Sequence, residues 1–184
     1  MIKIREYEVK NNVEELSVEQ FETVAGITND LGLDYLDKQM QIFEFLGVPT
    51  EAWEDMEVDE FKKAVEEFNA TEPKDYEFTS EIEIDGYTYK SFDKEFSLTI
   101  KDLKLIEKAV KTDGKKWMAT SLAVIFKRTD LTKAEHYASA HIKQKAKLFK
   151  DVNASIAIPF IQYIGKQLNT ALEQKVDEVT EGVE

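Results

Sequence analysis

The residues of this chain best suited to bind a metal ion are its two histidines, His136 and His141. They lie five positions apart in a segment expected to be helical, which separates them by about 140° around the helix axis. A zinc-binding pair on a helix instead occupies positions i and i+4, on one face. Glu135 is next to His136 in sequence but points in another direction. We therefore expect partly exposed histidines and no metal site.

Other chemistry is equally unsupported by the sequence. The chain has no cysteine, which excludes disulfides, thiolate metal ligands and cysteine nucleophiles. Its seven glycines are scattered singly, without a phosphate-binding loop, and Ser121 lacks the flanking glycines of a nucleophile elbow. A cluster of acids has no calcium-loop spacing and reads as a solvated face. The cluster contains Glu51, Glu54, Asp55, Glu57, Asp59 and Glu60. We expect a protein that is not an enzyme, with no catalytic residue, bound metal or cofactor.

Four lysines mark one predicted helix, at positions 143, 145, 147 and 150. Lysines of this kind bind phosphates in nucleic-acid complexes. The chain, however, carries a net charge of −13, and Arg5 and Arg128 are its only arginines. We therefore expect no nucleic-acid binding. The lysines form a solvated helix face or contact an acidic protein surface.

Charge is distributed unevenly along the sequence. The net charge is −14 over residues 1–80, +5 over residues 81–170 and −4 over residues 171–184. Two interpretations are open: electrostatic complementarity between the halves or between neighbouring copies in an assembly, or a charged surface that confers solubility. No segment approaches the roughly 18 apolar residues of a membrane span, and no apolar run follows the N-terminus as in a signal peptide. We expect no membrane association.

The sequence pattern in the first half of the chain predicts one extended segment followed by three helices. Residues 2–9 alternate between apolar and polar with one slip in phase, which is typical of a short strand or bent edge. Ser17 and Gln20 form a capping box for a helix. A second helix is expected from about 34 to 46, and Asp59 is placed to cap a third.

The second half opens on a hairpin. Residues 81–84 and 87–89 alternate on either side of Asp85-Gly86, a type I′ turn sequence, and the second strand is expected to continue irregularly to Phe96. Thr99 with Asp102 caps the next helix. A helix over residues 116–127 is apolar on most sides and is expected at the centre of the core.

Two further helices end the chain. Thr132 and Glu135 open a helix that runs to Phe149. The last helix is expected from about Asn153 into the 170s, with Pro159 either kinking it or lying near its start.

The sequence predicts that one structural unit occurs twice in this chain. Residues 16–21, LSVEQF, correspond to residues 98–103, LTIKDL, at an offset of 82 positions. The same offset aligns Val24 with Ile106, Met40 with Leu122, Ile42 with Val124 and Phe43 with Ile125. The predicted fold is α+β and mainly helical, with two related small helical units, each preceded by a short strand or hairpin. The predicted boundaries are residues 1–70 and 76–176, separated by a linker within 69–75 and followed by a disordered acidic tail at 177–184.

Each half resembles the small tail assembly chaperones of long-tailed bacteriophages. The resemblance is carried in the first half by residues 16–21, 40–51 and 58–61, and in the second by residues 84–89, 98–103 and 122–126. The family combines an extended segment or hairpin, a capped helix and a second helix with an apolar core. This chain departs from it by holding two units, and its first half lacks a glycine hairpin.

The resemblance implies a non-enzymatic function: shielding the tape-measure protein, or another tail protein, during tail assembly in the cytoplasm of the infected bacterium. Pro49, Trp53, Phe160 and Tyr163 are predicted to contact the protein partner, and oligomers are compatible with the sequence. Two alternatives are a permanent structural component of the virion, such as a connector, baseplate or packaged protein, and a protein-binding adaptor unrelated to phage.

Overall fold

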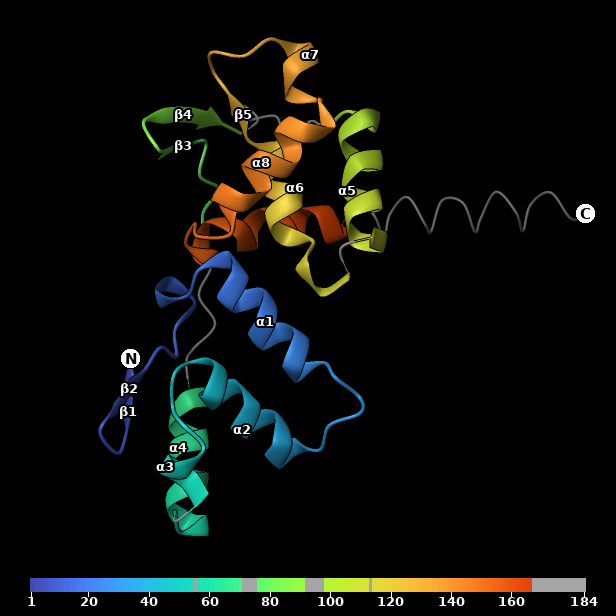
Figure 1. The fold of residues 1–184 in the computed structure, drawn as a ribbon. Helices are drawn as coiled ribbons and strands as arrows, with labels where there is room; N and C mark the ends of the chain where they lie inside the picture. Colours follow the sequence, from blue (N-terminus) through green and yellow to red (C-terminus); the bar gives the residue numbers. More distant parts are fainter. Residues whose placement is uncertain (55, 71–75, 92–97, 113, 167–184) are drawn as a thin grey trace, which may run out of the picture.

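The computed structural model describes residues 1–54, 56–70, 76–91, 98–112 and 114–166. Within these residues the fold is α+β and mainly helical, which confirms the predicted class. The elements form two lobes, one from the first 70 residues and one from residue 76 onward (Figure 1). The predicted tail, the predicted continuation of the second strand to Phe96 and most of the predicted linker lie outside the described residues.

The N-terminal lobe begins with a hairpin rather than the single bent strand that the sequence predicted. β1 (Ile2–Ile4) and β2 (Tyr7–Val9) pair antiparallel. The slip in the alternation marks a two-residue turn, in which Arg5 takes a left-handed φ of 52° without help from a glycine. The hairpin buries Ile4 and Val9.

The short 3₁₀ helix η1 (Val13–Glu15) leads into the α-helices of the first half. These are α1 (Val18–Thr28), α2 (Tyr35–Phe45), α3 (Glu51–Glu54) and α4 (Val58–Asn69). The predicted capping box is present, since the Gln20 N–H donates to Ser17 Oγ at 3.2 Å and the Ser17 N–H donates to Gln20 Oε1 at 3.1 Å.

Asp59 is not the N-cap of α4, in contrast to the prediction. Glu57 occupies that position without a side-chain hydrogen bond. Asp59 lies in the first turn of the helix, where an acid still interacts favourably with the helix dipole.

Phe43 lies at the centre of the N-terminal core. Its ring centroid is 5.7 Å from that of Trp53, 6.1 Å from that of Phe61 and 5.3 Å from that of Phe68. These aromatic contacts join α2, α3 and α4 into one cluster, against which the hairpin packs.

The C-terminal lobe contains a three-stranded antiparallel sheet. Its strands are β3 (Glu81–Ile84), β4 (Tyr87–Lys90) and β5 (Lys127–Arg128), in that spatial order. The predicted Asp85-Gly86 turn is confirmed, with φ values of 52° and 75°. A type I′ turn requires positive φ at both positions, which this dipeptide tolerates.

The helices of this lobe surround one buried helix. They are α5 (Ile100–Thr112), the short 3₁₀ helix η2 (Gly114–Lys116), α6 (Met118–Ile125), α7 (Lys133–His136), α8 (Ser139–Phe149) and an unlabelled helix over residues 154–166. α6 is central, as predicted, and its buried residues include Leu122 and Ile125. Pro159 lies in the second turn of the last helix.

The single helix predicted from Thr132 to Phe149 is instead two helices. The Thr132–Glu135 capping box forms, but α7 ends after one turn and Ala138 adopts an extended ψ of 125°. The break lets Tyr137 turn its hydroxyl toward the Asp102 carboxylate on α5, to which it donates at 2.9 Å. A long-range hydrogen bond thus accompanies a break that no local sequence signal indicated.

α1 connects the two lobes. Its first residue, Val18, is fully buried within the hydrophobic cluster of the C-terminal lobe. The Val18 N–H donates to the Val152 carbonyl at 2.8 Å, and the Ala154 N–H donates to the Leu16 carbonyl at 2.9 Å. The proposed boundary at residue 70 stays a prediction, and part of the first unit packs in the core of the second.

The described helices support the internal duplication. The offset found in the sequence carries α1 onto α5, α2 onto α6 and α3 onto α7, and no pair of helix bounds differs by more than two positions. An offset shorter by one position carries α4 onto α8 and aligns the core residues Phe61 with Ile142 and Phe68 with Phe149. The two halves therefore share four helices in one order, and the segment between the third and fourth is one position shorter in the second half.

Candidate binding groove

A groove of about 470 Å³ lies between α5 and α8. α6 packs against both helices and contributes to the floor of the groove. Most of the side chains that line the floor are apolar, and they come from all three helices. They are Leu105, Ala109, Val124, Ile142 and Ala146. The groove therefore offers an apolar surface between two helices.

Lysines line the edges of this groove. Lys108 comes from α5, and Lys143 and Lys147 come from α8. Lys150 directly follows the last residue of α8. Lys150 pairs with Glu19 at 3.0 Å. The other three are exposed and make no ion pair with another residue in the part of the chain that the structure describes. The groove thus joins an apolar floor to unpaired positive charge.

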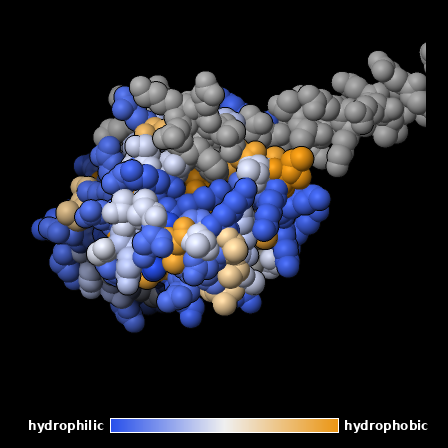
Figure 2. Space-filling model, turned by 90° about the horizontal axis from the view of Figure 1, so that it is seen from above, coloured by the Kyte–Doolittle hydropathy of each residue, from blue (hydrophilic) through white to orange (hydrophobic). Residues whose placement is uncertain are grey.

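The face of the molecule that carries α7 has a different character. Seen from the end of the molecule that carries α7, most of the surface is hydrophilic, and hydrophobic residues emerge in small groups (Figure 2). A mainly hydrophilic surface of this kind resists nonspecific association.

A buried polar cluster fixes one end of the groove. Tyr137 lines the groove, and its hydroxyl contacts both the Asp102 carboxylate and the Lys127 ammonium, the latter at 3.2 Å. Burial acts to raise the pKa of Asp102. Hydrogen bonds from Thr99 and Tyr137 and the charge of Lys127 outweigh burial, so the pKa of Asp102 is lowered. The carboxylate stays ionised and holds Tyr137 in place.

Lys145 does not belong to the exposed lysine face that the sequence indicated. It is buried on the opposite side of α8, where its ammonium donates to the Phe126 carbonyl at 3.0 Å. Burial lowers the pKa of Lys145 to about 8. Its neighbours at 143, 147 and 150 share the groove side, because a helix places residues three and four positions apart on one face.

The two histidines lie on different helices, with His136 at the end of α7 and His141 on α8. Burial is the main cause that lowers both pKa values, and Lys145 adds to it. Both rings therefore favour the neutral form. Among the described residues, no group of three or more acids or histidines is arranged to hold a metal ion.

The predicted partner residues lie outside the groove. Pro49 is half-buried just before α3, and Trp53 is buried in the N-terminal core. Phe160 is buried in the C-terminal core, with its ring centroid 5.0 Å from that of Phe126, and Tyr163 is half-buried nearby. Direct partner contact by Trp53 or Phe160 would require their cores to open. These four assignments stay predictions.

Sequence reasoning missed the groove because its floor is assembled from three helices. Leu105, Val124 and Ala146 carry no local sign that they share a cavity. The only signal was the lysine spacing on α8, which already favoured contact with an acidic protein surface as one interpretation.

Comparison of the chain with protein-family models, curated protein sequences and solved structures gives no match. Among the described residues, no helix has both the length and the apolar character needed to cross a membrane.

Proposed function

We propose that this protein is a non-enzymatic bacteriophage morphogenesis protein, a tail assembly chaperone that shields the tape-measure protein in the host cytoplasm. The observation that carries the proposal is the groove between α5 and α8, with its apolar floor and lysine edges. The sequence resemblance supplies the biological setting, and the groove supplies a surface suited to that task.

The groove suits an amphipathic helix. An α-helix with its side chains is about 10 Å across and presents apolar residues along one stripe. Placed between α5 and α8, such a stripe covers Leu105, Val124 and Ala146, and the partner helix completes a packed group of helices around α6. The exposed lysines at positions 108, 143 and 147 then favour a partner with acidic residues beside the stripe.

The charge of the chain fits the same task. Before the tail tube forms around it, a long helical tape-measure protein exposes apolar surface and tends to aggregate. The segment of residues 1–80, with a net charge of −14, keeps a chaperone-covered partner soluble, while the groove holds its apolar stripe.

Site-specific cross-linking in the native host during infection tests this proposal. A photoreactive phenylalanine analogue at position 146, on the groove, is expected to cross-link to a helical segment of the tape-measure protein. The same analogue at position 133, on exposed α7, serves as the matched control and is expected to give no such product. Equal cross-linking from both positions, or none from position 146, would exclude the groove as the binding surface.

Charge reversal provides a second readout. The double variant Lys143→Glu/Lys147→Glu is expected to lower recovery of the tape-measure protein by at least about tenfold, because like charges face an acidic partner. The control Lys62→Glu/Lys133→Glu makes the same change in net charge at exposed positions away from the groove and is expected to retain recovery.

Purified virions distinguish the chaperone from a permanent structural component. A chaperone is released when the tube forms, so mass spectrometry of mature particles is expected to lack this chain. Its presence there at a fixed number of copies would identify a structural component instead.

A further inference from the structure

The contact between the lobes has a defined chemical pattern. On one side, the start of α1 contributes Val18, which is buried in the C-terminal cluster, and Glu19. The Glu19 carboxylate lies 3.0 Å from the Lys150 ammonium and 3.6 Å from that of Lys116. Farther along α1, Glu22 accepts a hydrogen bond from the Met118 N–H at the start of α6. An apolar residue and two acids therefore meet the start of a helix and two lysines.

The duplication places a second copy of each side elsewhere in the molecule. For the α1 side, we add the offset of 82 positions to each residue number, which leads to the start of α5. There Ile100 corresponds to Val18, Lys101 to Glu19 and Lys104 to Glu22. We call the surface formed by Ile100, Lys101 and Lys104 the α5 end.

The receiving side also has a counterpart. Subtracting the same 82 positions from residues 116–118 leads to the start of α2, where the corresponding residues are Asp34, Tyr35 and Leu36. We call these three residues the α2 end. The α2 end is the counterpart, in the N-terminal unit, of the surface that contacts α1.

Both ends carry exposed apolar residues in the part of the chain that the structure describes. Ile100 is 73% exposed, Tyr35 is 65% exposed and Leu36 is 52% exposed, which places all three among the exposed large hydrophobic residues of the described chain. Their counterparts Val18 and Met118 are buried or partly buried at the contact between the lobes. The difference in exposure between each residue and its counterpart shows that the contact made by the α1 side is not repeated within one molecule at these two ends.

The charges at the two ends are complementary, with the signs exchanged. The acids of the α1 side, at positions 19 and 22, are replaced at the α5 end by Lys101 and Lys104. Lys116 of the receiving side is replaced at the α2 end by Asp34. The pair Glu19–Lys116 thus becomes Lys101–Asp34, which remains attractive between two molecules.

Lys101 already has one neighbour within its own lobe. Its ammonium lies 4.0 Å from the centroid of the Tyr137 ring, which is a cation–π contact at an exposed site. The Lys101 side chain is nevertheless exposed, and an ammonium has three donors. The same group is therefore available to a carboxylate of another molecule.

We propose that the α5 end of one molecule binds the α2 end of a second copy, in an arrangement that repeats the part of the contact between the lobes that Lys116 and Met118 make with α1. Ile100 packs against Tyr35 and Leu36 of the next copy. The two lysines of the α5 end face the Asp34 carboxylate of that copy. The proposal does not depend on the groove or on the tape-measure protein.

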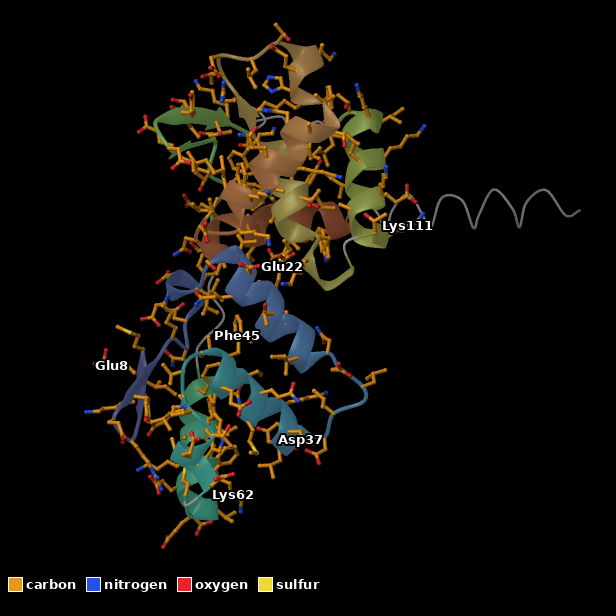
Figure 3. All side chains as sticks on the ribbon, viewed as in Figure 1. Glu8, Glu22, Asp37, Phe45, Lys62 and Lys111 are labelled. Atoms are coloured by element: carbon orange, nitrogen blue, oxygen red, sulfur yellow. The ribbon has the colours of Figure 1, made fainter. Side chains whose placement is uncertain are left out.

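The two ends lie far apart on the molecule. α5 begins at the end of the C-terminal lobe near α7, whereas Asp37, in the first turn of α2, lies in the opposite lobe (Figures 1 and 3). A contact between two different surfaces is heterologous, so copies add head to tail and form a ring or an open chain.

Assembly of this kind depends on protein concentration. Inside one molecule, the chain that links the lobes raises the effective concentration of the two contacting surfaces. Between molecules this help is lost, and assembly depends on protein concentration.

Light scattering coupled to size-exclusion chromatography of the full-length protein tests the proposal. The mass is expected to rise with concentration beyond that of a dimer and to fall as salt screens the charges. Ile100→Asp and Leu36→Asp are each expected to weaken self-association by at least about tenfold, because each places an unpaired charge in the contact. Val58→Asp, at an exposed apolar position on α4, is the matched control and retains assembly.

Mixing the two variants gives the decisive result. The Ile100→Asp protein keeps an intact α2 end, and the Leu36→Asp protein keeps an intact α5 end. Together they are expected to form a one-to-one dimer that grows no further. The proposal is overturned if the wild type stays monomeric at all concentrations, if Val58→Asp disrupts assembly as strongly, or if the mixture contains only monomers.

Discussion

Glu22 places a carboxyl group, 2% exposed, at the junction between α1 and the C-terminal lobe (Figure 3). One oxygen accepts the Met118 N–H, and the other has no hydrogen-bond partner among the described residues. Burial raises the pKa of Glu22 to about 7, although the Met118 N–H and the nearby Lys116 and Lys150 act in the opposite direction. The junction between the lobes is therefore sensitive to pH at this residue.

The sign of this effect follows from linkage. The folded state binds the Glu22 proton more tightly than the unfolded state, whose pKa is near 4.5. The free energy of unfolding therefore falls as pH rises from about 4.5 to about 7, because an ionised carboxylate must then be held in a buried site.

Glu22→Gln is expected to remove this dependence, because glutamine can still accept the Met118 N–H without carrying a charge. Above about pH 7 the variant should be more stable than the wild type by at most about 3 kcal/mol, with the difference declining toward pH 4.5. Urea denaturation over a pH series measures it. Glu8→Gln, at an exposed carboxylate, is the control and should leave the pH profile unchanged. A constant offset between Glu22→Gln and the wild type at every pH would contradict the assignment.

At the scale of the elements, short helices are held by tertiary contacts more than by their own hydrogen bonds. α3 has four residues, too few for stability in isolation. Its Trp53 is buried against Phe43, and this contact anchors the helix to α2. In the described conformation Trp53 therefore acts as a core residue.

Trp53→Ala is expected to destabilise the protein by about 3–5 kcal/mol, because it leaves a large cavity in the N-terminal core. Urea denaturation followed by far-UV circular dichroism measures the change. Leu31→Ala, at a side chain that is 98% exposed, is the control and should stay within about 0.5 kcal/mol of the wild type. A Trp53→Ala protein as stable as this control would show that Trp53 contributes little to the core.

At the scale of the whole molecule, α1 makes the two lobes depend on each other. Val18 belongs to the C-terminal cluster, and its N–H bonds to the Val152 carbonyl. Glu19 adds its pairs with Lys150 and Lys116. Unfolding of the N-terminal lobe therefore removes part of the core of its neighbour, and the lobes are expected to unfold with partial cooperativity.

Val18→Ala is expected to lower the free energy of unfolding by about 1–3 kcal/mol through loss of two buried methyl groups. Hydrogen exchange followed by mass spectrometry locates the effect: exchange should increase in α6 and α8, in the lobe that does not contain residue 18. Val58→Ala, at an exposed position of α4, is the control. Faster exchange confined to α2 and α4 would contradict a shared core.

Several features of this protein were determined by short sequence segments. The Ser17–Gln20 and Thr132–Glu135 capping boxes and the Asp85-Gly86 turn each depend on two to four consecutive positions, and all three form as predicted. The apolar character of residues 118–125 was enough to place α6 at the centre. The offset between the halves, visible in a few apolar positions, reappears in the helix bounds.

Other features were decided only by tertiary structure. The Arg5 turn, the break before α8 and the burial of Trp53 have no distinctive local signal. The groove likewise combines side chains from three helices that are separated in sequence. Local signals act through hydrogen bonds and backbone preferences within one turn, whereas these features depend on many weak contacts between distant segments.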